Sequence, residues 1–107
     1  MVFPTGIDIE SSINSYKSQK QFFSCLADNG VVLYGQRSGN ATVLQFGVFG
    51  GSPYLDYIYR DCSGERVQVC LDKNVTSVPT WEINNSFYEG VFTVEGIERL
   101  TGCTYKG

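Results

Sequence analysis

The sequence has no histidine among its 107 residues. Histidine is the commonest general base near neutral pH and the commonest zinc ligand in proteins. Its absence excludes a serine catalytic triad and any zinc site built on imidazole. The chain also lacks a CxxC pair, and the spacings of 37, 8 and 33 residues between its four cysteines match no zinc ribbon or knuckle. We therefore expect neither a metal nor a cofactor.

Long hydrophobic runs and clusters of basic residues are missing as well. No apolar stretch reaches the roughly 20 residues that a membrane-spanning helix needs, and residues 1–15 lack the basic start and apolar core of a signal peptide. The eight Lys and Arg residues are scattered singly and the net charge is −3, so no basic stripe is available to neutralise phosphates. We expect no membrane insertion of this chain and no nucleic-acid partner.

What the chain does have is enough apolar mass for one core. Hydrophobic residues make up 42% and aromatic residues 14% of the sequence, and its length suits a single domain. An even number of cysteines without metal-binding spacing favours two disulfides. Disulfides imply an oxidising setting, such as a lumen, the periplasm, the cell exterior or a virion.

Apolar periodicity and turn residues predict the order αβαβα followed by ββα. Residues 1–15 mix Pro4 and Gly6 with small polar residues, so we expect an irregular arm ahead of one domain over residues 16–107. The helices are expected over residues 16–28, 41–49, 65–73 and 94–101, and the strands over 31–34, 54–60, 78–84 and 86–89.

Local signals mark several of these boundaries. Asn29-Gly30 ends the first helix, and Thr93 and Gly102 are the expected N-cap and stop of the last one. Asn84-Asn85 tolerates positive φ and suits a tight hairpin turn. Apolar spacing predicts which side chains line the core: Val43, Leu44, Phe46 and Phe49 continue the pattern in the second helix, Val67, Cys70 and Leu71 face inward in the third, and Trp81 is a core residue.

This order is that of the thioredoxin fold, and several stretches resemble one group of such domains. They are FFSCLADNGVVLYG (22–35), DCSGERVQVC (61–70), VPTWEINNSFYEGV (78–91) and LTGC (100–103). They are similar to the thioredoxin-like domains attached to bacterial, archaeal and plant homologues of vitamin K epoxide reductase, and to related stand-alone domains. The resemblance implies an α/β fold whose central mixed sheet of about four strands is flanked by helices.

The same resemblance places a redox motif where this chain has none. The family carries Trp-Cys-Pro-x-Cys between the positions of Tyr34-Gly35 and Phe49-Gly50, and an ungapped register that also includes Gln45 puts Gly39 at the nucleophile and Thr42 at the resolving cysteine. Thiol–disulfide exchange needs a thiolate at a helix N-terminus and a second thiol that releases the mixed disulfide. The departure predicts that the family's usual activity is lost, so we do not expect an enzyme.

In the related domains, the counterparts of Cys62 and Cys70 look like a structural or secondary disulfide, and the expected strand end and helix leave the pair close enough to bond. A relay role is the alternative, and the structural role is favoured because there is no CxxC to relay to. Cys25 and Cys103 are then assigned to each other partly by elimination. Two free buried thiols or an intermolecular bond are the alternatives for them, and four cysteines allow three connectivities.

Val78-Pro79 resembles the cis-proline turn that faces the active site in thioredoxin folds, where the residue before proline presents its backbone to an extended peptide. Val78, Pro79 and Thr80 are therefore candidate peptide-binding residues. The alternative is that Pro79 only shapes the entry to a strand.

Three hypotheses follow from these observations. The first is a disulfide-stabilised structural or interaction module, a small subunit of a larger protein complex or a virion component. The second is a non-catalytic peptide-binding domain that uses the cis-proline face. The third is an atypical oxidoreductase that uses Cys62 and Cys70.

Overall fold

The structure is a computed structural model that describes the backbone of residues 9–105 and the side chains of residues 17–105. The chain forms four α-helices, two short 3-10 helices and four strands within these residues: α1 (Ile9–Asp28), β1 (Val32–Gly35), α2 (Asn40–Val48), η1 (Pro53–Tyr57), β2 (Tyr59–Asp61), η2 (Gly64–Arg66), α3 (Val67–Leu71), β3 (Thr80–Ile83), β4 (Ser86–Glu89) and α4 (Val94–Thr101).

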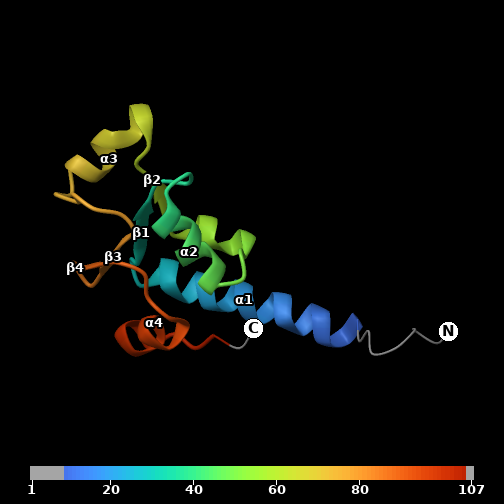
Figure 1. The fold of residues 1–107 in the computed structure, drawn as a ribbon. Helices are drawn as coiled ribbons and strands as arrows, with labels where there is room; N and C mark the ends of the chain where they lie inside the picture. Colours follow the sequence, from blue (N-terminus) through green and yellow to red (C-terminus); the bar gives the residue numbers. More distant parts are fainter. Residues whose placement is uncertain (1–8, 106–107) are drawn as a thin grey trace.

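The four strands form one mixed sheet in the order β2-β1-β3-β4 (Figure 1). β1 and β2 are parallel and are joined by the crossover through α2, whereas β3 is antiparallel to both β1 and β4. The α/β class with a four-stranded mixed sheet is confirmed, and the strand order and directions are compatible with a thioredoxin-like fold.

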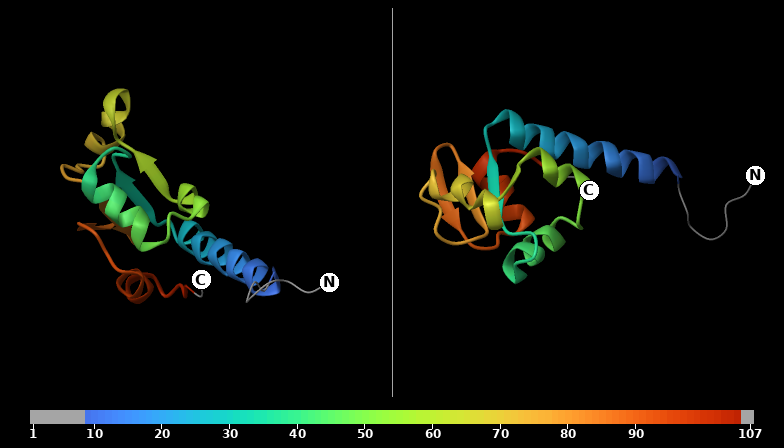
Figure 2. Two further views of the ribbon diagram at one scale, coloured as in Figure 1. Left: turned by 45° about the vertical axis from the view of Figure 1, so that its right-hand side comes forward. Right: turned by 90° about the horizontal axis from the view of Figure 1, so that it is seen from above.

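One face of the sheet carries the main core. Side chains alternate along a strand, so Leu33 of β1 and Trp81 and Ile83 of β3 point to the same side. Phe22 and Phe23 of α1 pack against them, and each fully buried Phe stabilises the fold by about 1.5–3 kcal/mol. α2 and α4 contribute Phe46 and Ile97 to the same cluster. This side of the sheet is therefore covered by three helices, with the N-terminal part of α1 extending beyond them (Figure 2).

The opposite face carries a smaller cluster that is held by α3. Its buried members are Tyr34, Cys62, Cys70 and Val75. α3 is only five residues long and lies apart from α1 and α4 (Figure 1). It contacts β2 and η2, its neighbours along the chain. Much of this face is consequently left uncovered by helices.

The hairpin and the last helix form where local signals predicted them. Asn84 and Asn85 have φ values of 52° and 64°, as a two-residue primed turn requires. Thr93 caps α4 by accepting a hydrogen bond from the amide of Gly96 at 3.0 Å, and Gly102 ends the helix with a φ of 77°. Both predictions are confirmed.

The expected arm over residues 1–15 is wrong from Ile9 onward, because α1 already begins there. No glycine or proline interrupts the sequence between Ile9 and Asp28. Once the C-terminal half of α1 has packed on the core, each further residue added to the helix gains one hydrogen bond, so the helix extends toward the N-terminus. Residues 1–8 lie outside the described residues.

The second strand is also shorter than predicted. Residues 54–60 were expected to be extended, but Pro53–Tyr57 forms η1 and only Tyr59–Asp61 pairs in the sheet. Ser52 accepts a hydrogen bond from the amide of Tyr54 and starts the 3-10 helix. The turn then buries Leu55 and Ile58, which are three residues apart and so lie on one side of a 3-10 helix.

Two helices bury different residues from those expected. The third helix is η2 followed by α3, and Val67 and Leu71 are 46% and 51% exposed, so that only Cys70 faces inward. The short helix has no second layer to pack against. In α2 the buried side chains are Thr42 and Gln45, while Val43 and Leu44 are exposed because the helix turns this polar side to the sheet.

Candidate functional site

The two positions that the resemblance equates with redox cysteines lie together at the start of α2. Gly39 precedes the helix. Thr42 is in the first turn of the helix and has no exposed surface. A Cβ atom added to Gly39 would lie 3.7 Å from Thr42 Oγ1. That hydroxyl accepts a hydrogen bond from the backbone amide of Gln36 at 3.1 Å. Neither residue can form a thiolate, so the local geometry holds a hydroxyl where exchange would need sulfur.

All four cysteines are in disulfides. Cys25 bonds to Cys103 with their Cα atoms 6.0 Å apart, and Cys62 bonds to Cys70 with a Cα separation of 5.7 Å. The predicted pairing is confirmed, and it selects one of the three connectivities that the sequence allowed. The first disulfide joins the end of α1 to the segment after α4. The second ties α3 to the end of β2.

The bond between Val78 and Pro79 is cis. Pro79 and Thr80 are buried, so of the three candidate peptide-binding residues only Val78 offers surface. The Thr80 hydroxyl donates to the carbonyl of Ser77 at 2.7 Å, and the carbonyl of Pro79 accepts from the amide of Gly90 at 2.8 Å. The amide and carbonyl of Val78, by contrast, form no backbone hydrogen bond within residues 9–105. Val78 therefore presents free backbone groups beside a strand.

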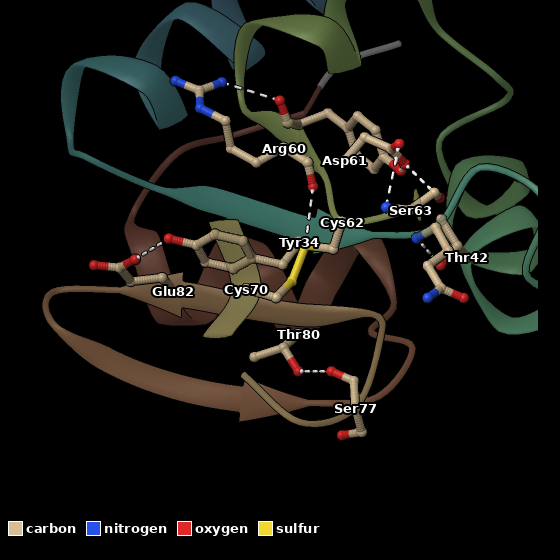
Figure 3. Close-up of a disulfide and its surroundings, with 12 residues drawn as sticks. Tyr34, Thr42, Arg60, Asp61, Cys62, Ser63, Cys70, Ser77, Thr80 and Glu82 are labelled. Carbon is tan, nitrogen blue, oxygen red and sulfur yellow. Dashed lines mark hydrogen bonds between the residues drawn. A yellow bond between two sulfur atoms is a disulfide. The ribbon is translucent and has the colours of Figure 1, made fainter. Parts of the chain in front are cut away.

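A groove of about 320 Å³ adjoins Val78 and the disulfide of α3. It runs between the loop after β1 and the loop before β3, and its lining carries no charged residue: Gln36, Cys62, Val67, Cys70, Leu71, Val75, Thr76, Ser77 and Val78. Gln36 connects it to the start of α2, since its carbonyl accepts from the amide of Gly39 at 2.8 Å. Figure 3 shows the disulfide with Thr42, Ser77 and Thr80 around it. The groove therefore lies next to the positions that the resemblance equates with redox cysteines.

A second groove, of about 550 Å³, is charged and was not predicted from the sequence. Its lining is Arg37, Asp56, Tyr59, Arg60, Asp61, Arg66 and Val69. The guanidinium of Arg37 lies 4.7 Å from the centre of the Tyr59 ring and 2.9 Å from Asp56 Oδ1. The hydrogen bond to Asp56 raises the pKa of Arg37 further above its usual value. These residues come from the loop after β1, from residues 56–61 and from residues 66–69, so no single local pattern indicated that they meet.

Asp61 organises one side of this charged groove. Its Oδ1 accepts hydrogen bonds from Tyr59 Oη at 2.7 Å, from Ser63 Oγ at 3.2 Å and from the backbone amide of Arg37 at 3.3 Å. Partial burial alone would raise the pKa of the Asp61 carboxyl, but these hydrogen bonds outweigh it and lower the pKa below the usual value. Burial, followed by the hydrogen bond to Asp61, raises the pKa of the Tyr59 hydroxyl.

Besides the two grooves, a polar cluster lies under α3, on the open face of the sheet. The buried hydroxyl of Tyr34 donates to Glu82 Oε1 at 2.7 Å (Figure 3). Lys73 Nζ lies 3.8 Å from Glu82 Oε2. Burial, followed by the hydrogen bond and charge of Glu82, raises the pKa of Tyr34. Each member has a partner, which is what burial of polar groups in a fold requires.

No family model matches the sequence of this chain. No curated protein matches it significantly either. The resemblance to thioredoxin-like domains of vitamin K epoxide reductase homologues therefore stays a prediction, and the fold class rests on the structure.

The groups at these two grooves that could contact a ligand are apolar side chains, the backbone amide and carbonyl of Val78, and guanidinium groups. Within residues 17–105, whose side chains the structure describes, no three cysteine or acidic side chains are grouped so that they could hold a metal ion. None of the helices of residues 9–105 is long and apolar enough to cross a membrane.

Proposed function

We propose that this domain is a disulfide-bonded interaction module without thiol–disulfide exchange, and that it holds an extended segment of a partner protein in the apolar groove beside Cys62–Cys70. One observation carries the proposal. Val78 has an amide and a carbonyl without a backbone partner among residues 9–105, and it lies at the edge of a groove whose lining includes the exposed apolar side chains of Val67 and Leu71. An extended peptide can pair with such backbone groups while one of its side chains enters the groove.

The absence of exchange chemistry in the proposal rests on the start of α2 and on the cysteines. Gly39 and Thr42 supply no thiol, and all four cysteines are already bonded to one another. The alternative of an enzyme that uses Cys62 and Cys70 needs a thiolate to reach one of these sulfur atoms. The two residues are 2% and 4% exposed, which favours a stabilising role for their disulfide.

A purely structural role in a larger assembly, a virion included, is the broader form of the proposal. Two disulfides are compatible with an oxidising environment, in which such a module would be stable. The groove favours the narrower form, because exposed Val67 and Leu71 around it are not needed for the core.

Backbone amide chemical shifts of the 15N-labelled domain test the proposal. The probe is an acetylated and amidated nonapeptide of glycine and serine with one central leucine, and its control has serine at the centre. We expect the leucine peptide to shift Gln36, Leu71 and residues 76–78 in a saturable way. Leu71→Ser should weaken this binding, and Leu44→Ser, at a residue that is 65% exposed on α2, should not.

Shifts confined to α1 or α4, or equal shifts with the serine control, would contradict the proposal. A response that Leu44→Ser removes and Leu71→Ser leaves intact would place the binding surface on α2 instead.

A further inference from the structure

We infer that the segment bound in the apolar groove carries an aspartate or glutamate side chain close to its apolar residue, and that Arg66, with Arg60, recognises this carboxylate. The inference rests on the proposed function, because it concerns the ligand of the same face. It follows from the position of the charged groove, from the charges in it and from the groups there that lack partners.

The two grooves have no lining residue in common, but pairs of chain neighbours connect their linings. Gln36, Cys62 and Val67 line the apolar groove, and the residues next to them in the chain, Arg37, Asp61 and Arg66, line the charged one. Both grooves are also reached by the same short helix, since Leu71 lines the first and Val69 the second. An extended segment rises about 3.3 Å per residue. Because residues that are neighbours in the chain line the two grooves, we expect a short extended segment to reach both.

Both carboxylates of the charged groove already have partners within this chain. Asp56 pairs with the guanidinium of Arg37, and Asp61 accepts hydrogen bonds from Tyr59, Ser63 and the amide of Arg37. Three guanidinium groups and two carboxylates line the groove, so one positive charge is left over. A cationic side chain of a ligand would find no carboxylate there without an existing partner.

Two of the guanidinium groups remain available to a ligand. Among the residues that the structure describes, the Arg60 guanidinium donates only to the carbonyl of Tyr59, at 2.9 Å. The Arg66 guanidinium makes neither a hydrogen bond nor an ion pair with any residue that the structure describes, and both arginines are exposed. A guanidinium presents a planar array of donors that matches a carboxylate in a bidentate pair. The surface therefore favours an anionic group beside an apolar one.

Titrations with matched peptides test the inference. The probe is the amidated peptide Gly-Glu-Glu-Ser-Leu-Ser-Glu-Glu-Gly, which offers side-chain carboxylates on both sides of the leucine and no terminal carboxylate. Three comparison peptides are used. In two of them the four Glu are replaced by Gln or by Lys, and in the third the Leu is replaced by Ser. Dissociation constants come from amide chemical shifts of the 15N-labelled domain in low salt.

We expect the Glu peptide to bind about two- to fivefold more tightly than the Gln peptide, as exposed ion pairs usually do, and the Lys peptide to bind most weakly. The preference should shrink at high salt. Arg66→Gln should reduce this preference, and the double variant Arg60→Gln with Arg66→Gln should bring the Glu and Gln peptides to equal affinity. The matched control is Arg99→Gln, since Arg99 is exposed on α4, and it should leave the preference intact.

Three results overturn the inference or part of it, and they can be distinguished. Equal binding of the Glu and Gln peptides to the unmodified domain, with binding still dependent on the leucine and on Leu71, overturns the carboxylate preference and leaves the proposed function standing. Binding that does not depend on the leucine overturns both. A Glu preference that is unchanged in Arg66→Gln overturns the role of Arg66.

Discussion

Replacing Gln45 by methionine should destabilise the domain more than any other substitution of a polar side chain in α2. Gln45 has no exposed surface, and its amide makes three hydrogen bonds. Its Oε1 accepts from Trp81 Nε1 at 3.0 Å and from the amide of Phe92 at 2.7 Å, and its Nε2 donates to the carbonyl of Phe92 at 2.9 Å. These bonds join α2 to β3 and to the segment before α4.

The size of the effect follows from the groups left behind. Methionine has nearly the same shape as glutamine, so the cavity contribution is small and the change isolates the lost hydrogen bonds. A buried polar group without a partner costs about 1–3 kcal/mol. The Trp81 indole is fully buried, whereas Phe92 is half-buried and water can replace part of what it loses. We expect a loss of about 3 kcal/mol in the free energy of unfolding, or about 12–20 °C in the thermal midpoint.

Urea and thermal unfolding followed by circular dichroism, with the disulfides intact, measure this loss. Gln68→Met is the matched control, because the Gln68 side chain is exposed and donates only to Asp72. It should change stability by less than about 0.5 kcal/mol. A loss below about 1 kcal/mol for Gln45→Met would refute the reasoning that this amide holds α2 to the sheet.

Further predictions concern the disulfides and the pH dependence of stability. Changing Cys62 and Cys70 together to serine should cost about 2.5 kcal/mol for a sequence separation of 8, and hydrogen exchange should speed up in residues 63–78 while β1 and β3 stay protected. Exchange rising equally across the sheet would contradict this. Removing the Cys25–Cys103 disulfide, which has a sequence separation of 78, should cost about 4.5 kcal/mol in the same urea assay. A smaller cost than for Cys62–Cys70 would contradict this. The folded-state pKa of Asp61 lies below its usual 3.8, so its carboxylate stabilises the fold above that pH and the contribution is lost as the pH falls through the folded-state pKa. Asp61→Asn should therefore flatten the fall in stability below about pH 4, and parallel curves for both proteins would contradict it.

The parts of the fold that the sequence predicted correctly depend on local chemistry. The Asn84-Asn85 turn and the Thr93 cap act within a few residues, so their signals are complete in the sequence. The strand over residues 54–60 failed because Leu55 and Ile58, three residues apart, pack as a 3-10 turn. Apolar content alone does not distinguish such a turn from a strand.

The buried side of a helix is harder to predict where tertiary partners are polar. In α2, Gln45 is buried because Trp81 and Phe92 supply partners for its amide, and Val43 is exposed in consequence. In α3, Val67 is exposed because no other layer covers the short helix. Sequence periodicity contains neither piece of information.

The candidate site was predicted in part. The positions of Gly39 and Thr42 came from the resemblance, and the structure brings them together at the start of α2. Val78 was singled out for the same reason, whereas burial removes Thr80 from contact with a ligand. The charged groove was missed, because Arg37 and Arg66 meet only through the folding of β1 next to β2.

Insulin reduction in the presence of dithiothreitol tests the central claim most directly, that this scaffold lost its exchange chemistry at Gly39 and Thr42. The account predicts no turnover above the uncatalysed rate for the natural sequence. The double variant Gly39→Cys with Thr42→Cys should gain turnover, since the new thiols would lie at a helix N-terminus and close enough to form a disulfide. Turnover by the natural sequence that disappears when Cys62 and Cys70 are changed to serine would contradict the account.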